Sequence, residues 1–220
     1  MTRINAILRW FLSTATLAAV AFFAAGRTHL PMVRAYIATF AAITLLAALM
    51  VDPGLFEERS NPGSIGLDPF SSTGISILFL STVAVAAMDA GRFHWTHDIT
   101  YLTQVTALVF VALFMSLQVW AMAVNPFFSS VIRLQTDRRH RVITRGPYRF
   151  IRHPGYFAML FSMPATAIAL GSVIALVPAV IGSLVILRRT IHEDRFLRNE
   201  LAGYAGYMLM VPYRLIPGLW

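Results

Sequence analysis

YLTQVTALVFVALFMSLQVWAMAV, residues 101–124, is the stretch of sequence that decides the fold. It contains no Asp, Glu, Lys or Arg, and its most polar side chains are two glutamines. About 20 consecutive apolar residues in a helix are enough to cross the hydrocarbon core of a bilayer. The stretch therefore predicts a membrane-spanning helix over 101–124.

Five further apolar runs predict helices of the same kind, at 7–25, 32–51, 73–90, 155–170 and 173–187. The last two are joined by only Gly171 and Ser172, which predicts a tight helical hairpin of short or tilted spans. The first run could be read as a signal peptide, but its long apolar part favours a retained helix. We expect an all-α integral membrane protein with about six membrane helices.

The composition excludes most other classes of protein. Hydrophobic residues make up 57% of the 220-residue chain and charged residues 13%, whereas a soluble domain carries about 25% charged residues. There is no cysteine, which excludes disulfides, thiolate metal sites and cysteine nucleophiles. All 18 basic residues are arginine, so chemistry that needs a lysine is excluded as well.

The arginines are distributed unevenly between the two ends of the predicted spans. If the N-terminus is cytoplasmic, the cytoplasmic segments hold 15 arginines and the opposite segments hold 3. Positive residues gather on the cytoplasmic side of membrane proteins. We therefore expect both termini in the cytoplasm. Abundant arginine and alanine without lysine is typical of a GC-rich genome, and we expect a bacterial inner membrane.

The chain changes character near residue 125. Residues 1–124 predict a four-span membrane scaffold, and residues 125–220 hold most polar residues that could do chemistry. The stretch RLQTDRRHRVITRGPYRFIR, residues 133–152, has seven arginines against one acid, and one reading is a basic loop at anionic headgroups. It contains the turn signal Gly146-Pro147-Tyr148. Next, Pro154 suits the first turn of a helix capped by His153.

A second polar cluster, residues 188–195, follows the last predicted span. Arg189 and Glu193 are four residues apart and would share one face of a helix. An interfacial helix with ordinary surface ion pairs is the alternative. The arginine distribution places both polar clusters on one side of the membrane, and the predicted hairpin folds them toward each other.

Together these motifs resemble the isoprenylcysteine carboxyl methyltransferase family, which is similar to phospholipid methyltransferases. The resembling residues are Gly146-Pro147-Tyr148, Arg152-His153-Pro154-Gly155-Tyr156 and Arg189-Thr190-Ile191-His192-Glu193-Asp194, and the match covers about 125–220. The resemblance implies methyl transfer from S-adenosylmethionine to a lipophilic acceptor, with a cofactor pocket at the cytoplasmic face of the C-terminal half. A prenylcysteine-like carboxylate is the acceptor that it favours, while an amine or a thiol stays open.

The resemblance also implies roles for individual residues. Arg189 would bind the substrate carboxylate, and Arg189 and Glu193 would be the catalytic residues. Asp194 stands where the family has a second Glu, which weakens any role assigned to it. The implied cofactor-binding residues are Gln135, His140, Arg141, Val142, Ile143, Tyr148, His153, Pro154, Gly155, Tyr156 and Glu193.

Two other functions remain as alternatives. One is an intramembrane NADPH-dependent reductase of the sterol or isoprenoid type, because arginines could bind its phosphates. The other is a non-enzymatic scaffold that binds anionic lipids. We expect membrane lipids and a lipophilic or prenylated substrate as partners, no nucleic acid and no metal site, and the oligomeric state is left open.

Aromatic residues outside these motifs predict positions at the membrane interface. Asn125, Pro126, Phe127 and Phe128 would end the fourth span, with the two phenylalanines at the interface. Tyr204, Tyr207 and Trp220 would be interfacial anchors.

Overall fold

A computed structural model describes residues 3–62 and 68–220, and no strand occurs among them. The helices are α1 (Arg3–Ala25), α2 (Pro31–Met50), α3 (Pro53–Ser60), α4 (Pro69–Met88), the π-helix η1 (Asp89–Phe93), α5 (Tyr101–Val124), the 3-10 helices η2 (Thr136–Arg138) and η3 (Gly146–Arg149), α6 (Pro154–Ala169), α7 (Leu176–Glu200) and α8 (Tyr204–Met210). The expected all-α class is confirmed.

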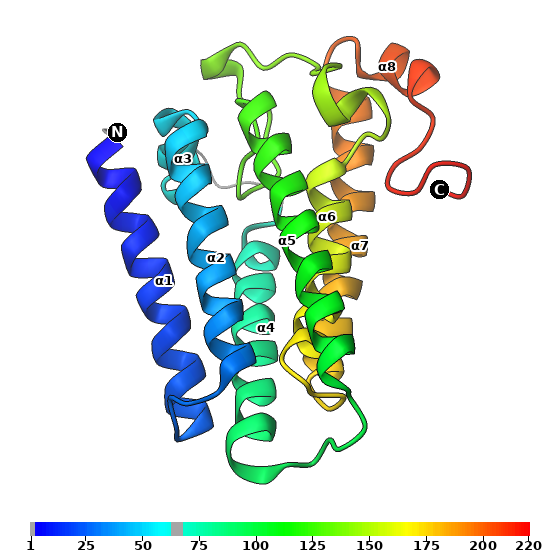
Figure 1. The fold of residues 1–220 in the computed structure, drawn as a ribbon. Coiled ribbons are helices and arrows are strands. Elements are labelled where there is room, and N and C mark those ends of the chain that lie inside the picture. Colours follow the sequence, from blue (N-terminus) through cyan, green and yellow to red (C-terminus); the bar gives the residue numbers. More distant parts are fainter. Residues whose placement is uncertain (1–2, 63–67) are drawn as a thin grey trace.

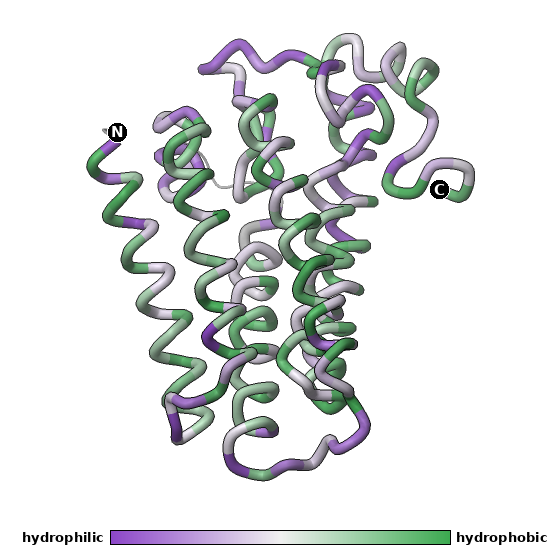
Figure 2. Tube along the Cα trace, in the orientation of Figure 1, coloured by the Kyte–Doolittle hydropathy of each residue, from purple (hydrophilic) through white to green (hydrophobic). Residues whose placement is uncertain are grey.

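The long helices α1, α2, α4, α5, α6 and α7 run alternately up and down and form a bundle (Figure 1). The short helices α3 and α8 and both chain ends lie at one end of the bundle, at the top of the view, which we call the site end. Hydrophilic segments gather at the two ends, and the shafts of the helices are mostly hydrophobic (Figure 2).

In the part of the chain that the structure describes, four helical segments are long and apolar enough to cross a membrane: Arg3–Ala25, Pro31–Met50, Phe70–Phe93 and Tyr101–Val124. They correspond to the first four of the six expected spans. Helix α6 has only 16 residues, or about 24 Å, and is shorter than a hydrocarbon core of about 30 Å. Helix α7 is longer but becomes polar after Leu187. Crossing by these last two helices therefore stays a prediction.

Small residues fill the main core between the helices. Ala21, Ala86, Ala87 and Ala167 are at most 1% exposed and belong to one cluster. Small side chains let helix backbones approach closely, which favours packing where lipid tails offer no hydrophobic drive. Large apolar side chains such as Phe23, which is 85% exposed, point outward as expected for a lipid-facing surface.

Asp89, the first residue of η1, holds the tight hairpin between α6 and α7 in place. Its buried carboxylate accepts hydrogen bonds from the Thr96 N–H at 3.0 Å, from the Thr96 hydroxyl at 2.7 Å and from the Ser172 hydroxyl at 2.6 Å. Gly171 has φ +80°, a conformation that glycine adopts without strain. These contacts tie the hairpin turn to the end of α4 and so set the heights of α6 and α7.

Helix α7 differs from the expected second arm of the hairpin. It begins at Leu176 and continues without a break to Glu200, whereas the sequence indicated a span ending at Leu187. Arg189 and Glu193 therefore belong to the hairpin helix itself. Their positions at the site end follow rigidly from the packing of α7 against α4 and α6.

Candidate functional site

A cavity opens at the site end, among the segment after α5, the first turn of α6, the polar part of α7 and helix α8. It encloses about 760 Å³ of empty space, including its open mouth. It is lined by Asn125, Phe127, Phe128, Ser129, Val131, Ile132, Arg133, Gln135, His140, Arg141, Val142, Ile143, Tyr148, Arg152, His153, Gly155, Tyr156, Glu193, Phe196, Leu197, Leu201, Tyr204 and Tyr207.

Most of the residues implied by the family resemblance line this cavity. Pro154 is an exception, because it is the buried first residue of α6 and does not face the cavity. Arg189 is the other, since it lies behind Tyr156. The fold thus brings together residues from two polar clusters that are about 40 positions apart in sequence.

Asn125, the residue after α5, fixes the part of the cavity wall that follows this helix. Its side-chain oxygen accepts a hydrogen bond from the Phe127 N–H at 2.9 Å, and its Nδ2 donates to the Tyr148 hydroxyl at 3.1 Å. The Phe127 ring then packs on the His140 ring with 4.5 Å between the ring centres. Phe127 and Phe128 therefore line the cavity directly after the end of α5, and their place at the lipid interface stays a prediction.

Gln135 organises the loop that carries His140. It is 1% exposed, and its Nε2 donates to the Phe127 carbonyl at 2.8 Å while its Oε1 accepts from Arg138 at 2.8 Å. Burial lowers the pKa of His140 to about 4. His140 is therefore neutral at pH 7 and offers the cavity an uncharged ring.

Helix α3 from the N-terminal half supports the same wall. Glu58 forms a two-pronged ion pair with Arg133, at 2.8 Å to Nε and 2.7 Å to Nη2. It also accepts a hydrogen bond from the Ser129 hydroxyl at 3.0 Å. The hydrogen bonds from Arg133 are the main reason why the pKa of Glu58 lies below its usual range. The sequence did not predict this contact, because residues 52–72 are rich in Pro, Gly, Ser and Asp, a composition that indicates a loop.

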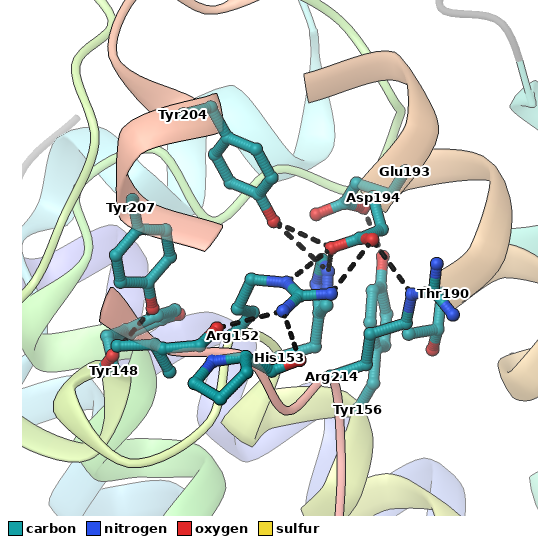
Figure 3. A network of polar contacts seen from close by, with 12 residues as sticks. Tyr148, Arg152, His153, Tyr156, Thr190, Glu193, Asp194, Tyr204, Tyr207 and Arg214 are labelled. Carbon is teal, nitrogen blue, oxygen red and sulfur yellow. Dashed lines mark hydrogen bonds and ion pairs between the residues drawn. The ribbon is translucent and has the colours of Figure 1, made fainter. Parts of the chain in front are cut away.

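Asp194 is the centre of a buried polar network (Figure 3). Its carboxylate accepts from Arg152 Nε at 2.8 Å, from the Tyr204 hydroxyl at 3.0 Å and from Arg214 Nε at 2.8 Å, and it lies 3.0 Å from His153 Nε2. Burial alone would raise the pKa of Asp194, but hydrogen bonds from His153, Arg152 and Arg214 hold it well below its usual range.

Asp194 therefore has a larger role than the sequence indicated. We expected its shorter side chain to weaken any function, yet it is 1% exposed and joins four partners. Tyr204 and Tyr207 are also buried, at 3% and 2% exposure, and both line the cavity. The prediction that these tyrosines are interfacial anchors was wrong.

Residues 211–214, which follow α8, hold the turn at the start of α6 in place. The Arg152 and His153 N–H groups donate to the carbonyls of Tyr213 and Arg214, each at 3.0 Å. Arg152 Nη1 also donates to the Val211 carbonyl at 2.8 Å. These bonds fix the segment at 152–153 so that His153 caps α6, as its place before Pro154 had indicated.

Glycine is required where α6 meets the cavity. A Cβ atom on Gly155 would lie 2.4 Å from the Phe128 ring, so a larger residue would push this wall outward. The tight packing explains why a glycine follows Pro154 in the helix-opening motif.

The Tyr156 hydroxyl links the cavity to Arg189. It donates to Glu193 Oε2 at 2.5 Å and accepts from Arg189 Nε at 2.7 Å. Arg189 is 2% exposed and also donates to the Ser71 hydroxyl at 2.6 Å and to the Ser130 carbonyl at 2.8 Å. The hydroxyl has one proton, which it donates to Glu193, and its oxygen accepts from Arg189, so Tyr156 joins the two residues.

The donor set of this cavity fits S-adenosylmethionine. The Glu193 carboxylate lines it and could accept a hydrogen bond from an ammonium group. The rings of Phe127 and His140, tilted by 32° to each other, offer faces for a nucleobase. Val142, Ile143, Leu197 and Leu201 supply apolar walls, which help to exclude water.

Comparison with known proteins agrees with the motifs. Residues 105–199 match the model of the isoprenylcysteine carboxyl methyltransferase (ICMT) family, so the resemblance seen in the sequence is confirmed. Two curated proteins named "Probable protein-S-isoprenylcysteine O-methyltransferase", from Oryza sativa subsp. indica and subsp. japonica, are each 36% identical over 76 residues. These alignments cover 33% of this chain, and the chain spans 38% of the length of each relative.

Proposed function

We propose that this protein is an integral membrane methyltransferase that uses S-adenosylmethionine and acts on a lipophilic acceptor, with a prenylcysteine-like carboxylate as the favoured acceptor. The observation that carries the proposal is the cavity that unites the helix-opening motif at 152–156 with Glu193. The family match over 105–199 supports the reaction class.

The cofactor would be held by the residues that line the cavity. In this proposal Glu193 accepts hydrogen bonds from the cofactor's amino group, and the rings of Phe127 and His140 border its adenine. When bound, S-adenosylmethionine would supply an activated methyl group: a nucleophile takes the methyl and the neutral sulfide leaves, which requires neither a metal nor a covalent enzyme intermediate. His140 suits the role of a neutral ring because burial keeps it uncharged.

The protein's own part in catalysis is alignment. A carboxylate acceptor is already ionised at pH 7, so its methylation needs no general base. Arg189 would fix the carboxylate through its planar guanidinium. Holding two reactants in line can supply a large part of a rate enhancement. Tyr156 connects the acceptor side at Arg189 with the cofactor side at Glu193.

Cofactor binding can be tested at Glu193 and His153. We expect Glu193→Ala and His153→Ala each to weaken binding of S-adenosylhomocysteine by about 1–3 kcal/mol, because each removes a polar contact at the cavity. This loss corresponds to a dissociation constant about 5-fold to 150-fold higher. Isothermal titration calorimetry measures it, and Glu200→Ala, an exposed acid on the same helix, is the matched control. Unchanged affinity in both cavity variants would refute this site. Stabilisation by NADPH instead would favour the reductase.

Orientation in the membrane follows from the arginine distribution. We propose that the site end faces the cytoplasm. The chain has no cysteine, so single cysteines can be introduced as reporters. We expect an impermeant thiol reagent to label Thr28→Cys in intact cells and to leave Ser60→Cys unlabelled until the cells are opened. Both positions are exposed, and they lie at opposite ends of the bundle. Labelling of Ser60→Cys from outside would reverse the orientation.

A further inference from the structure

A second arginine lies close to Arg189 and comes from the part of the chain before residue 125. Arg59, at the end of α3, donates one hydrogen bond, from Nη1 to the Phe128 carbonyl at 3.3 Å. Its guanidinium also lies over the Phe128 ring, 5.3 Å from the ring centre. An arginine has five N–H donors, so four of those on Arg59 have no bond to the described residues.

Arg59 and Arg189 are joined through one short stretch of backbone. The Ser130 hydroxyl donates to the Arg59 carbonyl at 2.7 Å, and the Ser130 carbonyl accepts from Arg189 Nη2 at 2.8 Å. Burial, with repulsion from Arg189 as a lesser cause, lowers the pKa of Arg59. Arginine still remains charged at any physiological pH. Both arginines thus bond to Ser130, Arg59 through its carbonyl and Arg189 through its guanidinium, directly after the cavity-lining Ser129.

Neither arginine of this pair directly touches a carboxylate of a described residue, although Glu193 attracts Arg189 across the Tyr156 hydroxyl. Within residues 3–62 and 68–220, neither Arg59 nor Arg189 forms an ion pair with a carboxylate. The arrangement differs from that of Arg133 and Arg152, which are each paired with a buried acid. The guanidinium of Arg59 is partly buried and has no counter-ion among the described residues, which is costly in a site of low dielectric, and an anionic ligand would lower that cost.

The cavity reaches the residues that these two arginines contact. Phe128, under the Arg59 guanidinium, and Tyr156, bonded to Arg189, both line it. We propose that Arg59 is a second substrate-binding residue, which together with Arg189 holds the carboxylate of the lipophilic acceptor. The inference rests on the proposed function and adds a residue outside the segment that matches the family.

The test uses N-acetyl-S-farnesylcysteine as the acceptor and its carboxamide as an uncharged competitor. In the full-length protein we expect Arg59→Gln to raise the KM for the carboxylate at least 10-fold. The inhibition constant of the carboxamide and the affinity for S-adenosylhomocysteine should change by less than 2-fold. Arg145→Gln removes the same charge from an exposed arginine at the same end, and its kinetics should match the wild type.

Different results separate this inference from the proposed function. If the wild type binds S-adenosylhomocysteine but does not methylate the probe, the proposed carboxylate acceptor is wrong. If the wild type methylates it and Arg59→Gln keeps a normal KM, the role of Arg59 is overturned. A parallel loss of carboxamide binding would also overturn it, because a collapsed wall would affect both compounds. Should Arg59→Gln not fold, Arg59→Lys decides: a raised KM for the carboxylate alone supports the proposal, and a normal KM refutes it.

Discussion

Arg189→Ala is expected to abolish methyl transfer while leaving the affinity for S-adenosylhomocysteine within a few-fold of the wild type. Arg189 does not line the cavity, so its removal takes no direct contact from the cofactor. It stands one helical turn before Glu193, where the apolar part of α7 ends. A lipophilic acceptor that enters from the bilayer would bring its polar head to this level.

Arg189→Lys tests whether charge alone is enough. A lysine keeps the charge but loses the fork that donates at once to Tyr156, Ser71 and Ser130. We therefore expect little recovery of turnover. A residue that only anchored α7 to lipid headgroups would tolerate this change. Arg188→Ala, the exposed neighbour on the same helix, is the matched control and should keep normal turnover.

Two results would contradict this assignment. Normal turnover in Arg189→Ala would remove the residue from the reaction. Loss of cofactor binding with an unchanged apparent affinity for the acceptor would reverse the roles of Arg189 and Glu193. Because Arg189 also joins α7 to α4 through Ser71, the thermal unfolding midpoint must be measured beside the kinetics. A variant that unfolds below the assay temperature is compared only at a temperature where it is folded.

Hydropathy alone predicted the helices that face lipid, because each of them must satisfy its own backbone within an apolar stretch. The fourth span was predicted at residues 101–124, and α5 has these bounds. The end of α7 could not be predicted in this way. Residues after Leu187 are polar, but a helix continues as long as its backbone bonds and tertiary contacts hold, whatever its hydropathy.

The site was predictable where a local motif carried it. Pro154 in the first helical turn and His153 at its cap follow from backbone geometry, and the structure has both. The partner of Arg133 was not predictable, since Glu58 is 75 positions away and carries no local pattern. The chain has 10 acidic residues and 18 arginines, so each acid that becomes buried has several arginines that can pair with it. This imbalance was the available signal that Glu58 and Asp194 would be paired with arginines.

Asp194→Asn is expected to cause the largest loss of stability in this chain, about 3–5 kcal/mol. Removing one member of a buried ion pair leaves its partners charged and uncompensated. Here the partners are Arg152, which is 5% exposed, and the half-buried Arg214. Asparagine matches aspartate in size, so the loss would come from charge and hydrogen bonding rather than from a void. Asp137→Asn is the matched control: its side chain is 57% exposed and Arg133 keeps its buried pair with Glu58, so we expect a loss of about 0–1 kcal/mol.

Asp194→Asn should weaken cofactor binding in the cavity as well as lower the stability of the fold. Asp194 holds His153 and Tyr204, which both line the cavity, so we expect the affinity of Asp194→Asn for S-adenosylhomocysteine to fall at least 10-fold. Because the folded pKa of Asp194 is depressed, its stabilisation is present above the unfolded pKa and is lost only as the pH falls toward the folded value. The difference in thermal unfolding midpoint between wild type and Asp194→Asn should therefore be the same at pH 7 and pH 5. A difference that disappears at pH 5, or an Asp194→Asn protein as stable as Asp137→Asn, would show that the carboxylate is not the centre of this network.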